Sequence, residues 1–338
     1  MEPDPDVIAA LREVAYLLER ASESSRRASA FRHAARTLEQ LSPAEWQALA
    51  SGNAWTSLPG IGESTAGVIT ATIARTEPPY LARLRDARRP LAAESPLRTA
   101  VRGDLHTHTE ASDGSVPLEQ MAEAAAALGH EYLAVTDHSP RLRVANGLSA
   151  ERLTAQLECI GQYNRGAPLR VLTGIEVDIL NDGRLDQAPD LLARLDVVVA
   201  SVHSELRMPS DQMTHRMVAA VANPHVDVLG HCTGRLVTGE RGTRPQSQFD
   251  AEVVFEACRH FGVAVEINCR PERCDPPDDL LALAAQMGCD FAINTDAHAP
   301  GQLEFVAYGV ARAERAGIEP HRIITTWTLD DLLGRTRG

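Results

Sequence analysis

The sequence predicts an α/β fold, a distorted β/α barrel preceded by a small all-helical domain. From residue 101 onward, short apolar runs alternate with helical segments, the pattern of a parallel sheet with crossover helices. No glycine-rich dinucleotide-binding sequence follows the first of these runs, which favours a closed barrel over a doubly wound sheet. Before residue 76, apolar residues recur instead at the spacing of amphipathic helices.

The N-terminal region, residues 1–80, is predicted to hold four helices. They cover residues 6–20, 28–40, a short segment that begins at Pro43, and about 64–74. The last follows the glycine hairpin Leu58-Pro59-Gly60-Ile61-Gly62. Such a hairpin before a helix presents backbone N–H groups that suit a phosphate, but it also serves as a tight turn between packed helices. Both interpretations stay open.

A linker over residues 81–100 is predicted between this domain and a second one over residues 101–338. Prolines punctuate the region, and five arginines fall within it: Arg83, Arg85, Arg88, Arg89 and Arg98. These arginines fit either a solvated surface or a nucleic-acid contact.

Seven strands and six helices are predicted after residue 101. The apolar runs end at His106, Thr136, Val177, Val202, Leu229, Ile267 and Ile293, and the helices lie near 117–128, 150–164, 210–222, 247–261, 277–287 and 302–316. Ser149 and Ser210 are expected as N-caps, and Pro117 as a first-turn proline.

Composition limits the class of protein. The chain has 338 residues, a hydrophobic fraction of 44% and no apolar run of membrane-spanning length. Its six cysteines are scattered without CxxC pairs, so we expect free thiols in a reducing cytoplasm. All 33 basic residues are arginine, which excludes any mechanism that needs a lysine side chain. Residues 101–338 carry the whole net charge of −13, and such an acidic domain suits metal cations better than a polyanion.

Metal-binding side chains follow the predicted strands. Six of the twelve histidines lie there, and nine residues form the candidate ligand set: His106, His108, Asp113, His138, Glu176, His203, His231, Asp296 and His298. In barrels of this kind, functional groups gather at the C-terminal strand ends. Nine ligands exceed the needs of one ion and suit two or three divalent ions, Zn, Mn or Fe, that share a carboxylate. Such clusters clamp a phosphate oxygen and activate a bridging water as hydroxide, which predicts phosphoester hydrolysis.

These motifs resemble those of the polymerase and histidinol phosphatase (PHP) superfamily. The matching segments are His106-Thr-His108, Thr136-Asp-His138, Gly174-Ile-Glu176, Ser201-Val-His203, Gly230-His231 and Asp296-Ala-His298. The resemblance implies a seven-stranded barrel with a trinuclear site. His106, His108, Glu176 and Asp296 would hold one metal; Glu176 would bridge to a second held by His203 and His231; Asp113, His138 and His298 would hold the third.

One branch of the superfamily is closer, the bacterial family X DNA polymerases. The segments from Asn223 to Leu236 and from Glu266 to Asp275 resemble their PHP domain, and Ala30 to Arg36 with the Leu58–Gly62 hairpin resembles their small helix-hairpin-helix domain. The polymerase portion between the two is missing, so polymerase activity is excluded. Val68 and Ser64 stand where family members with lyase activity carry lysines, so lyase chemistry is excluded as well.

Secondary candidates accompany the ligands. With Glu176 and Asp296 we count Arg235 and Arg273 as catalytic, since both could hold a phosphate; the alternative for each is a salt bridge to Asp275 or to a ligand carboxylate. Asp137 and Asp178 are expected to orient ligand imidazoles. Cys269 and Cys274 are expected to be buried apolar residues. DNA contacts are assigned to Gly60, Gly62, Arg32 and Arg36, supplemented by Arg26 and Arg27.

Three functions compete. The first is a metal-dependent phosphoesterase that acts on nucleic-acid ends, with DNA bound by the N-terminal domain. The second is a small-molecule phosphatase of the histidinol-phosphate or nucleotide type, favoured by the acidic surface and by the missing lysines. The third is a non-catalytic DNA-binding adaptor, ranked last because an adaptor needs no intact ligand set. A membrane partner is not expected, and the N-terminal domain could instead serve only in packing or oligomerisation.

Overall fold

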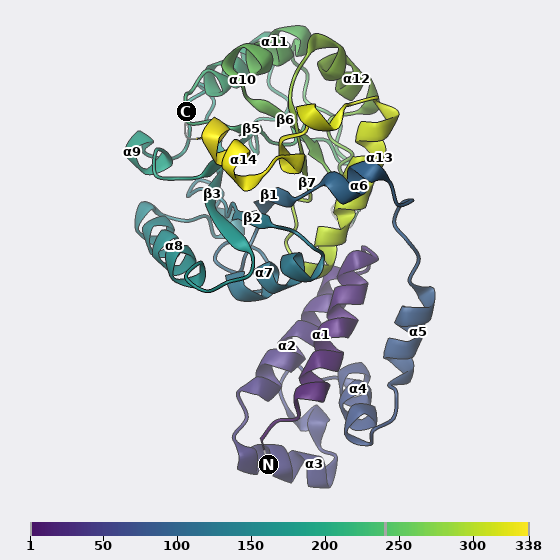
Figure 1. The fold of residues 1–338 in the computed structure, drawn as a ribbon. Helices are drawn as coiled ribbons and strands as arrows, with labels where there is room; N and C mark the ends of the chain where they lie inside the picture. Colours follow the sequence, from purple (N-terminus) through teal and green to yellow (C-terminus); the bar gives the residue numbers. More distant parts are fainter. Residues whose placement is uncertain (1, 240–241, 337–338) are drawn as a thin grey trace. The chain divides into compact units, whose positions relative to one another are not determined.

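The computed structural model describes residues 2–239 and 242–336 (Figure 1). It divides into two compact units, Met1–Pro90 and Leu91–Gly338. The first unit is all-helical and the second is a barrel of seven parallel strands surrounded by helices, as the sequence predicts.

Five α-helices form the N-terminal unit: α1 (Pro5–Arg20), α2 (Ser25–Glu39), α3 (Pro43–Gly52), α4 (Glu63–Ile73) and α5 (Pro79–Ala87). Local signals set their starts. Asp4 caps α1 by accepting a hydrogen bond from the Asp6 amide at 3.0 Å, and Ser42 with Glu45 forms a capping box on α3. The apolar stripes of these helices meet in one buried core.

The segment expected to be a linker, residues 81–100, contains most of α5 and a second short helix, α6 (Pro96–Ala100). Leu81 of α5 is buried in the core of the helical unit, so this part of the segment packs as an element of the unit. Proline punctuation does not reveal this, because Pro79 occupies the first turn of α5, where proline is tolerated.

The barrel strands follow one another in chain order, and each pairs in parallel with the next. They are β1 (Gly103–Thr107), β2 (Tyr132–Val135), β3 (Arg170–Asp178), β4 (Val197–Ser201), β5 (Val228–Leu229), β6 (Ala264–Asn268) and β7 (Phe291–Asn294). The first and last strands meet through an isolated bridge, Thr107 to Ala297, which nearly closes the barrel.

Helices connect the strands on the outside (Figure 1). They are α7 (Leu118–Ala127), α8 (Ala150–Tyr163), α9 (Pro189–Leu192), α10 (Ser210–Val221), α11 (Ala251–Phe261), α12 (Asp278–Met287) and α13 (Val306–Arg315), with α14 (Leu329–Thr336) at the C-terminus. Ser149 caps α8 as predicted. Two expected signals are shifted by one position: Pro209 is the N-cap of α10 in place of Ser210, and Pro117 is the N-cap of α7.

The amino ends of the strands are closed by an apolar plug. Side chains from all seven strands, including Tyr132, Val197 and Val228, form one buried cluster with Ile324 and Leu332 of the C-terminal segment. With this end filled, the carboxyl ends of the strands are the open end of the barrel. The polar residues predicted to be functional lie there.

Candidate metal centre

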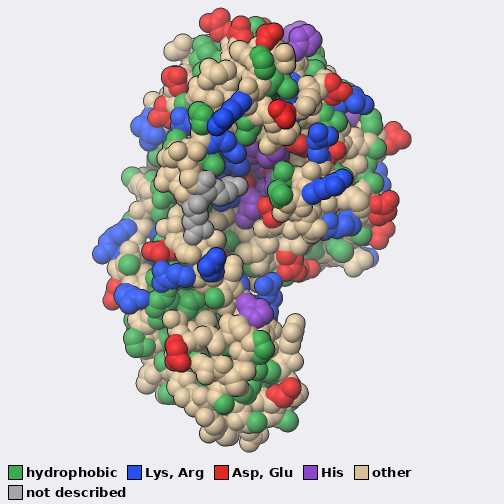
Figure 2. Space-filling view, turned by 180° about the vertical axis from the view of Figure 1, so that it is seen from behind, with side chains coloured by type: hydrophobic (Ala, Val, Ile, Leu, Met, Phe, Trp, Pro, Cys, Tyr) green, Lys and Arg blue, Asp and Glu red, His purple; other side chains and the backbone are tan. Residues whose placement is uncertain are grey.

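The nine predicted ligands converge at the carboxyl ends of the strands. Their ligand atoms form four overlapping groups, each with all atoms within 4.8 Å of one another: His108, Asp113, His138 and His298; His106, His108 and Glu176; His106, His231 and Asp296; His138, Glu176 and His203. Figure 2 shows histidines at the bottom of a hollow with arginines around it. The structure therefore brings the nine predicted residues together at one place.

Glu176 lies at the centre of the cluster. Five imidazoles surround its carboxylate: His138 Nδ1 at 2.9 Å, His231 Nε2 at 2.9 Å, His203 Nε2 at 3.2 Å, His106 Nε2 at 3.3 Å and His108 Nε2 at 3.6 Å. It comes from β3, near the middle of the strand order, so it is reached from both sides of the barrel. This position suits the bridging role that the resemblance implies.

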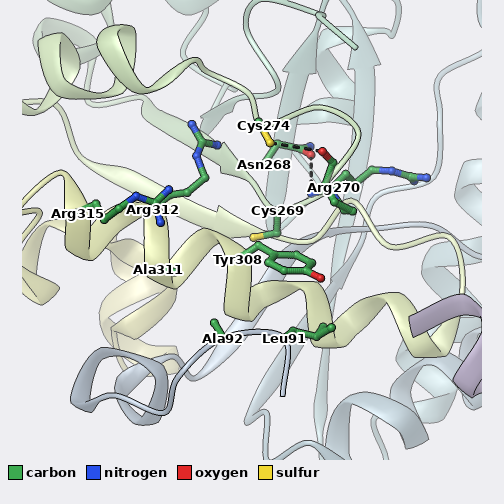
Figure 3. Close-up of a pocket in the computed structure, with 11 residues that line it drawn as sticks. Leu91, Ala92, Asn268, Cys269, Arg270, Cys274, Tyr308, Ala311, Arg312 and Arg315 are labelled. Carbon is green, nitrogen blue, oxygen red and sulfur yellow. Dashed lines mark hydrogen bonds between the residues drawn. The ribbon is translucent and has the colours of Figure 1, made fainter. Parts of the chain in front are cut away.

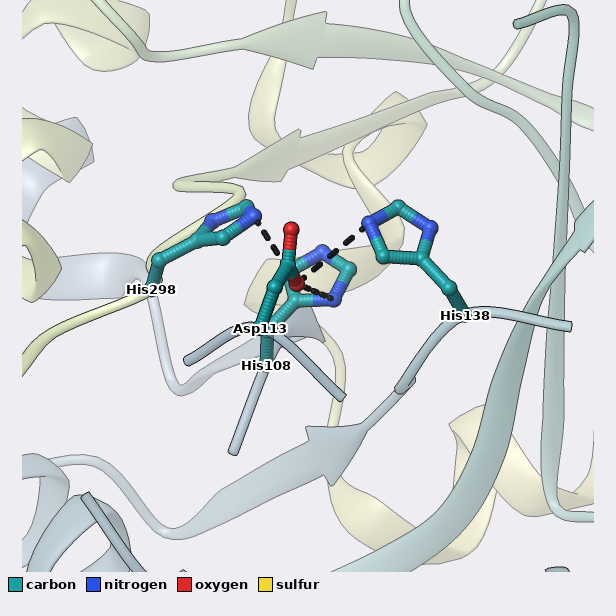
Figure 4. Close-up of side chains that lie close together, drawn as sticks. All are labelled: His108, Asp113, His138 and His298. Atoms are coloured by element: carbon teal, nitrogen blue, oxygen red, sulfur yellow. Dashed lines mark ion pairs between the residues drawn. The ribbon is translucent and has the colours of Figure 1, made fainter. Parts of the chain in front are cut away.

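Asp113 is the corresponding carboxylate on the other side of His108 (Figure 4). Its Oδ1 lies 3.4 Å from His298 Nε2, 3.6 Å from His138 Nε2 and 4.0 Å from His108 Nδ1. Asp296 faces His108 Nε2 at 3.4 Å, and its φ of 53° places it in the left-handed region, a strained conformation of the kind that occurs at functional sites.

The donor set fits divalent ions. Among the described residues, both Glu176 oxygens, both nitrogens of His108 and of His231, and His106 Nε2 are buried without a hydrogen-bond partner. Buried polar atoms are normally satisfied. Imidazole nitrogens and carboxylate oxygens that approach one another without hydrogen-bond geometry are instead arranged as ligands to a shared cation.

The electrostatics of the cluster are strongly coupled. Burial would lower the pKa of His106, but Glu266, Glu176 and Asp296 raise it well above its usual value. Burial and two neighbouring imidazoles lower the pKa of His108 to about 3, so this ring is neutral and able to bind a metal. Although burial opposes ionisation, the surrounding histidines hold the pKa of Glu176 well below its usual range.

Two buried carboxylates orient ligand histidines from behind. Asp178 contacts His203 Nδ1 at 3.1 Å, as predicted. Glu266 contacts His106 Nδ1 at 2.6 Å and accepts a hydrogen bond from the His231 amide at 2.7 Å. Glu266 is absent from the residues predicted from the sequence, although an acidic residue between the apolar Val265 and Ile267 of β6 is a usable signal. Such partners fix the tautomer and the direction of the ligand ring.

Asp137 does not orient an imidazole, contrary to our expectation. It accepts hydrogen bonds from Thr109, from Ser112 Oγ at 2.5 Å and from Gln156 Nε2 at 2.5 Å. Its role is to hold the loop that carries Asp113. Both oxygens of the carboxylate are used in these bonds.

The arginines of the site divide into different roles. Arg273 Nε lies 3.1 Å from Asp296 Oδ2, the ligand-carboxylate alternative of the sequence analysis. Arg235 donates to the backbone carbonyls of Arg273 and Cys274, which supports the loop after β6. Arg270, which the sequence analysis did not single out, contacts His298 Nδ1 at 2.9 Å.

A separate cavity of about 290 Å³ lies behind the loop after β6 (Figure 3). Cys269 and Cys274 line it together with Leu91 and residues of α13. Cys269 is fully buried, as expected, whereas Cys274 is partly exposed.

The predicted DNA contacts of the helical unit are only partly available. Gly60 has a φ of 80°, and a Cβ there would lie 2.4 Å from His33 Cδ2, so the hairpin needs glycine. Gly62 is the N-cap of α4, and Arg36 is exposed. The expected DNA contact at Arg32 needs correction. Arg32 is buried, and its guanidinium donates two hydrogen bonds to Glu19 at 2.9 and 2.8 Å, so it is a structural residue.

Fold and site together define a metal-dependent hydrolase of the β/α-barrel class. Comparison with known families makes this specific: residues 104–270 match the PHP domain family, and residues 2–77 match a helix-hairpin-helix domain family. The chain belongs to the PHP family and is a PHP-domain phosphoesterase. No described helix combines the length and the hydropathy that a bilayer span requires.

The chain is similar to proteins with two kinds of name, an exonuclease-containing polymerase and phosphatases. The chain is 39% identical over 233 residues to the DNA polymerase/3′-5′ exonuclease PolX of Bacillus subtilis, a match that covers 69% of this chain and only 40% of that protein. It is 30% identical over 208 residues to a probable phosphatase of Caldanaerobacter subterraneus, covering 58% of this chain and 75% of that protein. Among solved structures, the histidinol phosphate phosphatase of Lactococcus lactis aligns with a TM-score of 0.47 at 18% identity, over 65% of this chain and 95% of that one.

Proposed function

We propose that this phosphoesterase hydrolyses terminal phosphodiester bonds of a nucleic acid, as a 3′–5′ exonuclease or end-processing enzyme. The observation that carries the proposal is a set of three exposed arginines on two of the loops that follow the strands. Arg141 and Arg143 follow β2, and Arg207 follows β4; all three are exposed in a domain whose net charge is otherwise strongly negative. Exposed arginines around a phosphoesterase site suit the successive phosphates of a strand.

The helical unit and one relative support the same substrate. A helix-hairpin-helix domain with an exposed glycine hairpin offers backbone N–H groups to a DNA phosphate. Among the described residues, the amides of Gly60 and Gly62 donate no hydrogen bond within the protein, so they are available to a ligand. PolX of Bacillus subtilis, which carries exonuclease in its name, is similar over 69% of this chain.

We further propose that the nine ligands hold two or three divalent ions, zinc, manganese or iron. Following the family resemblance, the first group would be His106, His108, Glu176 and Asp296; the second Glu176, His203 and His231; the third Asp113, His138 and His298. The geometric groups overlap this partition but differ from it, since they place His231 with His106 and Asp296, and His138 also with Glu176 and His203. When bound, such ions polarise a phosphoryl oxygen and supply a nucleophilic hydroxide near neutral pH.

The chain's own residues prepare this chemistry. Glu266 and Asp178 hold His106 and His203 with their Nε2 atoms directed at Glu176. Arg273 keeps the Asp296 carboxylate in place through its 3.1 Å contact and lies close enough to the ligands to offer its other guanidinium nitrogens to a substrate phosphate. The apolar plug at the opposite end of the barrel keeps water from entering the site from below. The six free cysteines agree with a reducing cytoplasm as the proposed compartment.

A small-molecule phosphatase is the second candidate. The observation that favours it is the match to a probable phosphatase, of which the chain covers 75%. The loss of Arg32 as a DNA anchor points the same way, because it leaves fewer cations near the hairpin.

A parallel assay separates the candidates. The purified full chain, supplied with manganese, is incubated with 5′-labelled single-stranded DNA, with a chromogenic phosphodiester and with histidinol phosphate. The proposal predicts a ladder of products shortened from the 3′ end at a kcat/KM well above that for histidinol phosphate. A reversed preference would favour the second candidate, and the absence of hydrolysis on all three substrates would contradict both.

A further inference from the structure

The ligand histidines differ in the charge that stands behind them. Nδ1 of His106 is backed by the Glu266 carboxylate, at 2.6 Å. His203 is likewise backed by Asp178. Nδ1 of His298 lies closer to a cation than to a carboxylate: Arg270 Nη1 is 2.9 Å away and Asp296 Oδ1 is 3.5 Å away. A carboxylate behind an imidazole strengthens its binding to a cation, and an arginine does the opposite.

Arg270 is held firmly in this position. Its Nη1 donates to the Asp296 carbonyl at 3.0 Å, and its Nε donates to Glu272 Oε1 at 2.7 Å. Only 12% of its side chain is exposed. Figure 3 shows the side chain extending away from the cavity behind the loop. Because the guanidinium is tied on two sides, its charge cannot swing away when a cation binds nearby.

The carboxylates are also distributed unequally. Glu176 and Asp296 belong to the first two ligand groups, with Glu266 and Asp178 directly behind; all four side chains are at most 3% exposed. Glu176 also contacts His138 Nδ1 at 2.9 Å, so the third group shares part of its charge. Arg273 offsets one of these four charges. The group of His108, Asp113, His138 and His298 contains one carboxylate, Asp113, whose side chain is 34% exposed. Glu272 offsets part of the Arg270 charge from the far side of the guanidinium.

We infer that Arg270 makes the ion site at Asp113 the weakest of the centre, so that two ions bind tightly around Glu176 and a third binds weakly until an anionic substrate arrives. The inference rests on the proposed metal assignment. A phosphate group that reaches the third ion supplies the negative charge that the protein withholds at this position. The third ion and the substrate therefore bind cooperatively, each strengthening the other by the same factor.

Equilibrium dialysis of the full, metal-depleted chain against Mn²⁺ tests this inference, with bound metal counted by mass spectrometry. We expect two tight equivalents and a third with a Kd at least about tenfold higher. Asp113→Asn should remove only the weak equivalent. Arg270→Gln removes the charge and keeps a donor for the Asp296 carbonyl, and should tighten the third ion by about tenfold.

Matched variants separate charge from packing. Arg270→Lys keeps the charge and should leave the third ion weak. Arg315→Gln removes the same charge from an exposed position of α13 and should change the third Kd less than twofold. Thymidine 5′-monophosphate, a product analogue, should tighten the third ion in the unaltered chain more than in Arg270→Gln.

Failure of the inference differs from failure of the proposed function. Three equivalents of equal affinity would overturn the inference. The inference would also be overturned if Arg270→Gln raised the Kd of the third ion or left it unchanged, or if Arg270→Lys lowered that Kd. A nucleotide that does not change the Kd of the third ion would overturn it as well. Fewer than two tight equivalents in the unaltered chain would instead contradict the metal assignment itself.

Discussion

The two units of the chain treat buried charge in opposite ways. In the helical unit, the buried Arg32 is paired with Glu19 through two hydrogen bonds. In the barrel, Glu176 is equally buried, and neither of its oxygens has a hydrogen-bond partner among the described residues. A completed ion pair serves the fold, whereas an incomplete one requires a further ligand. The difference identifies the functional site more reliably than the presence of charged residues does.

Glu176→Gln gives the largest expected effect. Because this carboxylate is shared by five imidazoles, its loss should reduce phosphoesterase activity by at least about a hundredfold, about 2.7 kcal/mol in barrier. Steady-state hydrolysis of a chromogenic phosphodiester measures the loss. Glu252→Gln, an exposed residue of α11, is the control and should retain activity within twofold. A Glu176→Gln variant with more than a tenth of the activity would refute the central position of this residue.

Arg32→Met tests the other side of the comparison. The substitution removes the two guanidinium hydrogen bonds to the buried Glu19 carboxylate, and should lower the unfolding free energy of the helical unit by about 3–5 kcal/mol. Urea titration followed by tryptophan fluorescence, to which the buried Trp46 and Trp55 contribute, gives this value.

The control for Arg32 is Arg26→Met, an exposed position on the same helix, which should change stability by less than about 0.5 kcal/mol. The double variant Arg32→Met with Glu19→Met should recover part of the loss, since it also removes the buried Glu19 carboxylate. If Arg32→Met is as stable as Arg26→Met, the pair is not the structural element that we describe.

The sequence predicts which residues gather at the barrel end because strand ends and residue types are both local properties. His138 and His231 each follow a strand and His106 lies near the end of one, and parallel strands bring such ends together. The pairing of Arg32 with Glu19 depends instead on how two helices pack, which a single helix pattern does not contain. The same holds for Arg270, whose partner His298 lies on the next strand's loop and becomes its neighbour only in the folded barrel.

The linker prediction has a similar limit. Prolines mark breaks between helices, but they also occupy first turns, as Pro79 and Pro96 do. Whether a short helix such as α5 packs into a core depends on a single residue, Leu81. Composition alone does not report that contact.

Asp227 carries a carboxyl group at the amino ends of the strands, away from the ligand set. Its contribution to the unfolding free energy should depend on pH. Burial raises the pKa of Asp227 to about 7. A carboxyl whose pKa is higher in the folded state binds its proton more tightly there, so it lowers stability as the pH rises from about 4 to about 7. Asp227→Asn should therefore raise the unfolding free energy at pH 8 by about 1–3 kcal/mol and change it little at pH 4.5.

Urea titrations of the metal-depleted chain at pH 4.5 and pH 8 measure this difference. Glu158→Gln, an exposed position of α8, is the control and should show no such dependence. Equal effects of Asp227→Asn at the two pH values would contradict the assigned pKa.

Removal of residues 1–90 should give the smallest of these effects, a change in kcat/KM. It compares the two units directly, because it leaves the barrel without the helical unit. If the helical unit binds DNA through its hairpin, the truncated chain should lose several-fold in kcat/KM on oligonucleotides and little on a chromogenic phosphodiester, because only a long substrate reaches the hairpin. The oligonucleotide effect should shrink at high salt. Equal losses on both substrates would assign the unit to packing or oligomerisation, and would favour the small-molecule phosphatase.

The central claim is that the unsatisfied charges at the barrel end form a metal centre. Its most direct test is the metal content of the purified full chain, measured by mass spectrometry before and after reconstitution with manganese or zinc. The account predicts at least two equivalents of divalent metal per chain, with a clear loss in Glu176→Gln. Fewer than two equivalents after reconstitution, or a Glu176→Gln content equal to that of the unaltered chain, would contradict it.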